Sequence, residues 1–403
     1  MNRVLTNSMI FIGCEILSKS VPFLLLPYLT RVLHAEDFGA LGLFTSLQAL
    51  FIIGVSLSFD GALARYFYRY GSNNFDALLY HSLFLISILC FVFLCILQLT
   101  PWNNFLIKYA LITAALQAFF NVILTSKQCQ KKAFQYAFYQ ISFAIISASS
   151  TVILFKIWSY DVDTRIKSIF ISLLIVIFIF LSVNKRRNKR IFNLKAFNLN
   201  VLYYLSFGLP LIIHQLSLYI KGQFDRVLIA HSFSLSELAI YTAAFQLASC
   251  VNVIIMALNK ALVPYYFEAC KSGFFNANKV RKWFMISIPA TILPACVMMT
   301  FPDELFSFIL GPGYVGIKNI TIMFVLGFSM QVPYLLAVNF MFYNSNNKLV
   351  AFITFSSSFT HLILLYILKD LGVSYIPFAL IFSNTICLIM LFFIGIPSSV
   401  KKI

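Results

Sequence analysis

Charged residues are scarce in this sequence of 403 residues. Only 11% of the residues are Asp, Glu, Lys or Arg, against roughly 25% in an ordinary soluble domain, whereas 61% are hydrophobic and the mean hydropathy is +0.89. This deficit excludes a soluble globular protein. Because apolar runs near or above the ~20 residues that cross a bilayer recur along the whole length, the composition predicts an integral membrane protein with no separate soluble domain.

The sequence also lacks the short motifs of common enzymes and metal sites. It contains no HExxH, no phosphate-binding P-loop and no GxSxG element, and its eight cysteines show neither CxxC nor Cys/His ligand spacing. Asp161 and Asp163 could hold a metal for glycosyl transfer, but no companion cluster of acids or histidines accompanies them. We therefore expect no enzyme activity, no metal and no cofactor.

Twelve apolar segments are predicted to be transmembrane α-helices, because open sheet edges do not survive in hydrocarbon and no alternating pattern of a barrel dominates. The first segment continues past signal-peptide length without a cleavage site, so we expect it to be retained. The predicted spans are residues 5–29, 38–63, 78–100, 105–125, 134–157, 166–184, 199–221, 237–262, 283–301, 317–342, 348–369 and 373–396.

Positive charge predicts the orientation of these spans. Nineteen of the 30 lysines and arginines fall on the side of the two termini, nine on the other side and two within spans. The densest run is Lys185–Lys195, with six basic residues near the midpoint. Because cytoplasmic loops are rich in Lys and Arg, both termini and this run are predicted to be cytoplasmic, in a bacterial inner membrane. The net charge of +17 then needs no nucleic-acid partner, although contact with anionic lipid remains open.

An internal repeat predicts two related halves. Because each half has an even number of spans, the halves should share one orientation and be related by a pseudo-two-fold axis along the membrane normal. We expect a six-helix lobe over residues 1–184, a basic cytoplasmic linker over 185–198 and a second lobe over 199–403. The repeated stretches, at offsets of 195, 198 and 199 residues, are RVL at 31–33 and 226–228, ALGLF at 40–44 with LAIYT at 238–242, and DGALARYFY at 60–68 with NKALVPYYF at 259–267.

Polar residues in the first span of each half recur at helical spacing. Charges near the bilayer centre cost at least ~2.5 kcal/mol, so they normally face a polar interior or a partner. This spacing puts the residues of each span on one helical face, and both faces could line an aqueous cavity between the halves. Each set also includes a proline, and the residues are Ser8, Glu15, Lys19 and Pro22 in the first span and Pro210, His214, Ser217 and Lys221 in the seventh.

Structural interpretations of the same residues remain open. Glu15 and Lys19 lie one turn apart and could neutralise each other. His214 could be a satisfied interior histidine. Lys221, together with the following Asp225 and Arg226, could pair locally or extend toward the membrane surface at the outer end of its span.

Three stretches of the sequence resemble polysaccharide flippases of the O-antigen (Wzx) type, within the multidrug/oligosaccharidyl-lipid/polysaccharide (MOP) exporter superfamily. The resemblance implies an all-α, MATE-like fold of two six-helix lobes in a V around a central cavity. It also implies that an oligosaccharide on an undecaprenyl diphosphate carrier enters from the cytoplasm and is released toward the periplasm as the lobes rock, as lipopolysaccharide assembly requires. The stretches are PYLTRVLHAEDFGALGLF at 27–44, FDGALARYFYRY at 59–70 and FGLPLIIHQLSLYIKGQFDRVLIAHSFSLSELAIYTAAFQLA at 207–248.

The resemblance further implies roles for the polar residues. Basic side chains suit the diphosphate by charge, so the substrate-binding candidates are Lys19, Ser217 and Lys221. The candidates for ion coupling or gating are Glu15, Asp60, His214 and Asp225. The expected partners are the lipid-linked oligosaccharide, membrane lipids and other polysaccharide-assembly proteins.

Two other functions remain open. One is a cation-coupled multidrug exporter of the same superfamily. The other is a membrane polysaccharide polymerase or ligase, although such enzymes usually carry a long charged outward loop, and the longest one here, residues 301–316, is short and apolar.

Overall fold

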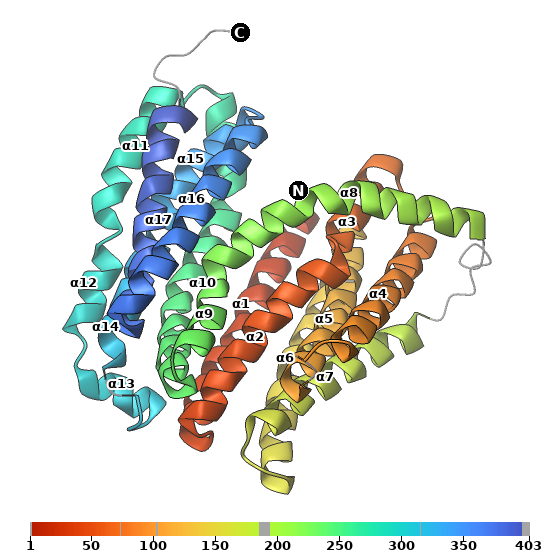
Figure 1. The fold of residues 1–403 in the computed structure, drawn as a ribbon. Helices are drawn as coiled ribbons and strands as arrows, with labels where there is room; N and C mark the ends of the chain where they lie inside the picture. The colour runs from red at the N-terminus through yellow and green to blue at the C-terminus, as the bar shows by residue number, and fades with distance from the viewer. Residues whose placement is uncertain (1, 73, 102–103, 185–193, 315, 397–403) are drawn as a thin grey trace. The chain divides into compact units, whose positions relative to one another are not determined.

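The computed structural model describes residues 2–72, 74–101, 104–184, 194–314 and 316–396, and every regular element in these ranges is a helix (Figure 1). Eleven segments of the described chain are helical, long and apolar enough to cross a membrane, and α1 (Asn2–Val32) is a further helix of 31 residues. The predicted all-α membrane fold with about twelve spans is confirmed. The other helices are α2 Ala35–Ser56, α3 Phe59–Tyr70, α4 Phe75–Gln98, α5 Phe105–Cys129, α6 Ala133–Ile157, α7 Val162–Val183, α8 Leu194–Gly222, α9 Phe224–Ser232, α10 Leu235–Lys271, α11 Ala277–Ala290, α12 Leu293–Thr300, α13 Asp303–Leu310, α14 Ile317–Ser329, α15 Gln331–Tyr343, α16 Asn347–Leu368 and α17 Pro377–Met390, with short 3-10 or π turns at 369–371, 373–375 and 391–395.

The contacts among the helices divide the chain into two compact units. Unit 1 comprises residues 1–25 and 32–219, and unit 2 comprises residues 26–31 and 220–403. The long helices α1 and α8 therefore each contribute residues to both units. Most of the basic run Lys185–Lys195, namely residues 185–193, lies outside the described part of the chain.

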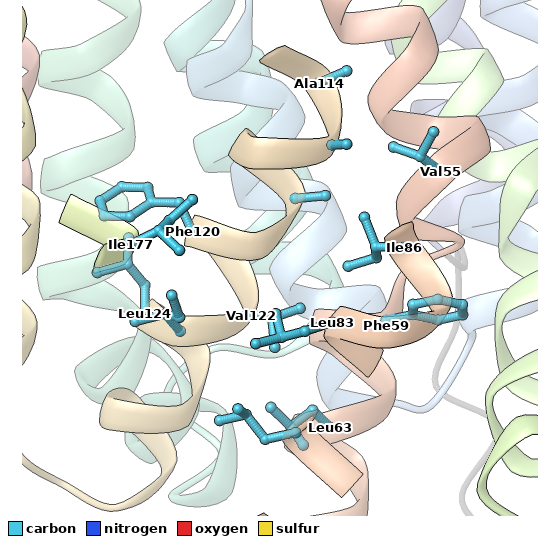
Figure 2. Packing of buried hydrophobic residues seen from close by; sticks show 14 of the residues in the cluster. Val55, Phe59, Leu63, Leu83, Ile86, Ala114, Phe120, Val122, Leu124 and Ile177 are labelled. Carbon is cyan, nitrogen blue, oxygen red and sulfur yellow. The ribbon is translucent and has the colours of Figure 1, made fainter. Parts of the chain in front are cut away.

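Helix α5 is the centre of unit 1, where it contacts α2, α3, α4, α6 and α7. Its residues Ala110, Ala114 and Ala118 are almost completely buried. Their spacing of four puts them on one helical face, and such small side chains let neighbouring membrane helices approach closely. Figure 2 shows the hydrophobic core around α5, in which the labelled residues are Val55, Phe59, Leu63, Leu83, Ile86, Ala114, Phe120, Val122, Leu124 and Ile177.

The second predicted span, residues 38–63, is not one helix. Leu57 (φ 42°) and Ser58 (φ 56°) adopt left-handed backbone conformations between α2 and α3. Two residues of α8 contact this break: Gln215 Nε2 donates to Ser58 Oγ at 2.5 Å, and a Cβ built on Gly208 would lie 2.1 Å from the Leu57 carbonyl oxygen. The prediction of a continuous helix was wrong because these contacts come from residues distant in sequence, and no glycine or proline marks the break.

Helix α10 is the longest helix of unit 2 and contacts α14 and α15. It begins with a capping box, in which Ser234 Oγ accepts from the Glu237 N–H at 3.2 Å and Glu237 Oε2 accepts from the Ser234 N–H at 3.0 Å. Two predicted spans of this unit are interrupted. Residues 283–301 divide into α11 and α12 shortly after Pro289, which lacks a backbone donor, and residues 317–342 divide into α14 and α15 at Met330.

Candidate functional site

The side chain of Lys221, near the end of α8, makes hydrogen bonds to two helices of unit 2. Its Nζ donates to Asn384 Oδ1 of α17 at 2.7 Å and to Ser357 Oγ of α16 at 2.9 Å. These acceptors are themselves fixed, because Asn384 Nδ2 donates to the Gly327 carbonyl at 2.9 Å and Ser357 Oγ donates to the Ser383 carbonyl at 2.6 Å. The ammonium is therefore held by neutral oxygens of unit 2, and the Lys221 side chain is half-buried.

Asp225 of α9 is 3% exposed, and its carboxylate accepts a hydrogen bond from the hydroxyl of Tyr241 on α10. His361 of α16 is 2% exposed. Its Nδ1 is 3.4 Å from Ser383 Oγ. Hydrogen bonds through Ser357 and Ser383 link Lys221 to His361. We call these four residues, with Asn384 and the Asp225–Tyr241 pair of the same unit, the unit 2 polar cluster.

Arg226 adds a second buried cation beside Asp225. It is 4% exposed, and its guanidinium carbon lies 4.2 Å from the ring centroid of Phe245, a cation–π distance. Its Nη1 donates to the Gly222 carbonyl at 3.2 Å and to the side chain of Gln223. Its backbone N–H donates to Asp225 Oδ1 at 2.9 Å. Unit 2 thus holds the half-buried cation Lys221 and the buried cation Arg226, and Arg226 lies next to the buried carboxylate of Asp225.

The remaining predicted site residues belong to unit 1 and not to the unit 2 polar cluster. Lys19 and His214 are exposed, and Asp60 is half-buried in the first turn of α3. Ser217 is buried, and its hydroxyl donates to the Ile213 carbonyl of its own helix at 2.9 Å. Glu15 lies in α1, and its side chain is outside the described part of the structure. Of the seven predicted residues, Lys221 and Asp225 are the two that belong to unit 2.

Unit 1 contains a half-buried cation, Arg165, whose role the sequence did not indicate. Arg165 of α7 donates through Nη1 to Thr151 Oγ1 at 2.6 Å, Ser168 Oγ at 3.1 Å and Ser147 Oγ at 3.3 Å. The sequence feature that could have indicated these hydrogen-bond acceptors for Arg165 is the pair of hydroxyl residues Ser147 and Thr151, which lie one helical turn apart in an apolar run. The same type of signal, a run of serines at 356–358, precedes His361 in α16.

Asp161 has a structural role at the start of α7. Its Oδ1 accepts from the Thr164 N–H at 2.7 Å and its Oδ2 accepts from the Ser159 hydroxyl at 2.6 Å. This is the geometry of a helix N-cap. No group of three His, Cys, Asp or Glu side chains that could hold a metal occurs in the described ranges. Helix capping therefore accounts for Asp161 in the acidic pair seen in the sequence.

Comparison with known proteins places the chain in a family. The family model for polysaccharide biosynthesis proteins matches residues 4–270. The chain belongs to the polysaccharide biosynthesis protein family. A protein of the Lsg locus of Haemophilus influenzae is 36% identical to it over 395 residues, which are 97% of this chain and 98% of the relative. A second relative from the same organism, described as an uncharacterized membrane protein, is 35% identical over 381 residues and 93% of each chain.

This polysaccharide biosynthesis protein also resembles solved transporter structures. A multidrug resistance MATE family transporter of the MOP superfamily, in its inward-facing conformation, aligns with a TM-score of 0.68 over 98% of this chain and 96% of the transporter. The two sequences are 16% identical, so the likeness concerns the fold alone. The MOP-type fold expected from the sequence is confirmed.

Proposed function

We propose that this protein is a flippase that moves an oligosaccharide linked to a polyprenyl diphosphate, such as an O-antigen repeat unit, from the cytoplasmic to the periplasmic leaflet. One combined observation carries the proposal: a chain of the polysaccharide biosynthesis family has the fold of a membrane transporter. Polysaccharide units that are built on a lipid inside the cell and used outside it must cross the membrane. A transporter fold within such a family is suited to that step.

The proposed orientation puts both termini and residues 185–198 in the cytoplasm of a bacterial cell, in the inner membrane. The excess of Lys and Arg on that side supports it. We further propose that residues 1–184 and 199–403 are homologous lobes joined by the basic linker, and that alternating access carries the substrate across.

Lys221 is the best-supported substrate residue in this scheme. Its ammonium donates to two neutral oxygens, and exchange of one of them for a diphosphate oxygen would give a charge-assisted hydrogen bond. Lys19 and Ser217 are the other proposed substrate contacts. Glu15, Asp60, His214 and Asp225 are proposed for ion coupling or gating, and the burial of Asp225 beside Tyr241 supports such a role for this residue.

A cation-coupled multidrug exporter is the second candidate, because the solved neighbour is a multidrug resistance transporter. The charges of the site favour the first candidate. A pocket for cationic drugs would be expected to present acidic groups, whereas unit 2 holds the cations Lys221 and Arg226 and, among the predicted site residues, one carboxylate, that of Asp225.

The test is to deplete the protein in its native cell and locate the lipid-linked glycan. Accumulation of single repeat units on the cytoplasmic leaflet is the expected result. Single units stranded on the periplasmic side would instead indicate a polymerase or ligase. A normal glycan together with increased drug sensitivity would contradict the flippase proposal in favour of drug export.

A further inference from the structure

An apolar cavity of about 210 Å³ lies within unit 2, between α10 and α15. Ile255 and Leu258 line it on α10, and Val332, Leu335 and Asn339 line it from one face of α15, because they are three and four residues apart. Leu258 is exposed, so the cavity opens at the surface of unit 2. An engineered aliphatic cavity of about 150 Å³ stays dry and binds benzene. At the same volume per carbon, this cavity holds about eight carbon atoms.

Two hydrogen bonds hold the walls of the cavity in place. Asn339 Nδ2 of α15 donates to Asn259 Oδ1 of α10 at 2.8 Å. The Tyr266 hydroxyl of α10 donates to the Leu336 carbonyl of α15 at 2.8 Å. The opposite face of α15 packs in a hydrophobic core of unit 2, where Ala337 is completely buried. Because α15 is fixed on both faces, it cannot collapse onto α10 and close the cavity.

The Asn259–Asn339 pair leaves two polar groups of the lining without a partner. Its single hydrogen bond does not use Asn259 Nδ2 or Asn339 Oδ1, and neither atom has a hydrogen-bond partner among the described residues. Rotation of both amides would leave the same two kinds of group, one donor and one acceptor. Asn339 is only 9% exposed, and buried polar groups nearly always have a partner. The pair therefore indicates a ligand group that both accepts and donates a hydrogen bond.

The polar pair lies nearer the end of a membrane span than the aliphatic part of the cavity does. Both walls belong to candidate spans, Leu235–Lys271 and Ile317–Tyr343. At 1.5 Å per residue, Asn339 lies about 6 Å before the end of the second span, and Val332 lies about 17 Å before it. An amphiphilic lipid has the same order, with its polar group toward the membrane surface and its hydrocarbon toward the centre of the bilayer.

We propose that this cavity binds a neutral lipid that carries a free hydroxyl group. The hydroxyl accepts from Asn259 Nδ2 and donates to Asn339 Oδ1, and about eight carbon atoms of the lipid fill the space toward Ile255 and Val332. A charged headgroup is not suited to the cavity, because none of the described lining residues is charged and an unpaired charge is costly to bury. This lipid site does not include Lys221 and does not depend on the proposed flippase function.

Photoaffinity labelling tests the proposal on the wild-type, full-length protein in vesicles. The probe is 1,2-dioctanoylglycerol with a diazirine in one acyl chain, and mass spectrometry locates the labelled residues. Label is expected within residues 255–266 and 332–339. Label that is confined to other segments would overturn the proposal.

A matched pair of glycerides tests the role of the hydroxyl group. Unlabelled 1,2-dioctanoylglycerol should compete with the probe about threefold to tenfold more strongly than its acetate ester, because acetylation removes the hydrogen-bond donor. This comparison uses the wild-type protein and needs no variant to fold. Equal competition by the two glycerides would contradict a hydroxyl site.

Two isomeric small molecules separate a lipid site from a site for a soluble alcohol. Octan-1-ol should compete more strongly than heptyl methyl ether, which has the same formula and lacks the donor. At equal concentration in the membrane, octan-1-ol should compete less strongly than 1,2-dioctanoylglycerol, because the second chain of the lipid adds contact with apolar surface. Competition by octan-1-ol that equals or exceeds competition by the lipid would contradict a lipid ligand.

Matched variants assign the effect to the asparagine pair. The double variant Asn259→Leu/Asn339→Leu replaces both partners of a hydrogen bond by apolar groups, a change that can be nearly neutral for stability, and it should abolish the preference for 1,2-dioctanoylglycerol over its acetate. The control is Gln117→Leu/Asn121→Leu, which removes another amide pair, bonded at 3.1 Å on α5 of unit 1, and should keep the preference. A folded Asn259→Leu/Asn339→Leu protein with the wild-type preference would overturn the proposed site.

Discussion

Replacement of Lys221 by methionine removes the ammonium from the unit 2 polar cluster and keeps a long unbranched side chain. Two hydrogen bonds are lost, to Ser357 Oγ and Asn384 Oδ1. Interhelical hydrogen bonds in membranes contribute about 0.6 kcal/mol on average and at most about 1.7 kcal/mol, so the free energy of unfolding should fall by about 1–3 kcal/mol. Both acceptors keep their other hydrogen bonds, and the variant should therefore fold.

Transport by Lys221→Met should fall much more than its stability. A hydrogen bond to a charged group contributes about 1.5–3 kcal/mol, so loss of a contact with the diphosphate in the rate-limiting state slows translocation about 10- to 100-fold. The assay is translocation of a lipid-linked oligosaccharide in proteoliposomes with matched protein content. Asn384→Leu, which removes one partner and retains the ammonium, is the control and should transport faster than Lys221→Met. A wild-type rate for Lys221→Met would refute the role of Lys221 in substrate binding.

Three further substitutions test other parts of the structure. Gly208→Ala places a Cβ 2.1 Å from the Leu57 carbonyl oxygen, so the free energy of unfolding, measured by thermal unfolding, should fall by about 1–3 kcal/mol. Gly13→Ala is the control, because a Cβ at Gly13 would meet no atom within 4 Å. Equal effects of the two substitutions would contradict the close packing at Gly208. Asp225→Asn keeps an acceptor for the Tyr241 hydroxyl and removes the negative charge, so the transport rate should no longer depend on an ion gradient. A transport rate that depends on the gradient as in the wild type would exclude Asp225 from ion coupling. Burial alone would raise the pKa of Asp161, but hydrogen bonds from a neighbouring hydroxyl and the α7 backbone lower that pKa below its usual value, about 3.9. The stabilisation from the ionised cap is therefore present above about pH 4 and lost as the pH falls through the lower folded pKa. Asp161→Asn should flatten the acid limb of a stability–pH curve, and an unaltered limb would count against the cap.

The positions of the membrane helices could be predicted from sequence because hydrophobic length is a local property. The first predicted span, 5–29, lies within α1 (Asn2–Val32), and the sixth, 166–184, nearly coincides with α7 (Val162–Val183). The break at Leu57 could not be predicted, because it depends on Gly208 and Gln215, about 150 residues later in the chain. Periodicity reports which residues face the same way along one helix, and not where a distant helix contacts it.

The candidate site was predictable only in part for the same reason. Lys221 and Asp225 stood out as charges at the end of an apolar run. His361 and Asn384 are single polar residues in later spans. Their relation to Lys221 depends on the packing of α16 and α17, which gives Asn384 a direct hydrogen bond to Lys221 and links His361 to it through Ser383 and Ser357. Asp161 was recognised as unusual, but its neighbours Ser159 and Thr164 identify it as a helix cap.

The most direct test of the proposed function uses the purified protein in vesicles that contain a fluorescent oligosaccharide on a polyprenyl diphosphate. A membrane-impermeant quencher reports the fraction of oligosaccharide in the outer leaflet. The flippase proposal predicts that the protected inner-leaflet fraction becomes accessible in vesicles with the protein, remains protected in empty vesicles, and is exposed much more slowly with Lys221→Met. A protected fraction that stays unchanged in the presence of folded wild-type protein, under every ion gradient applied, would contradict the proposal.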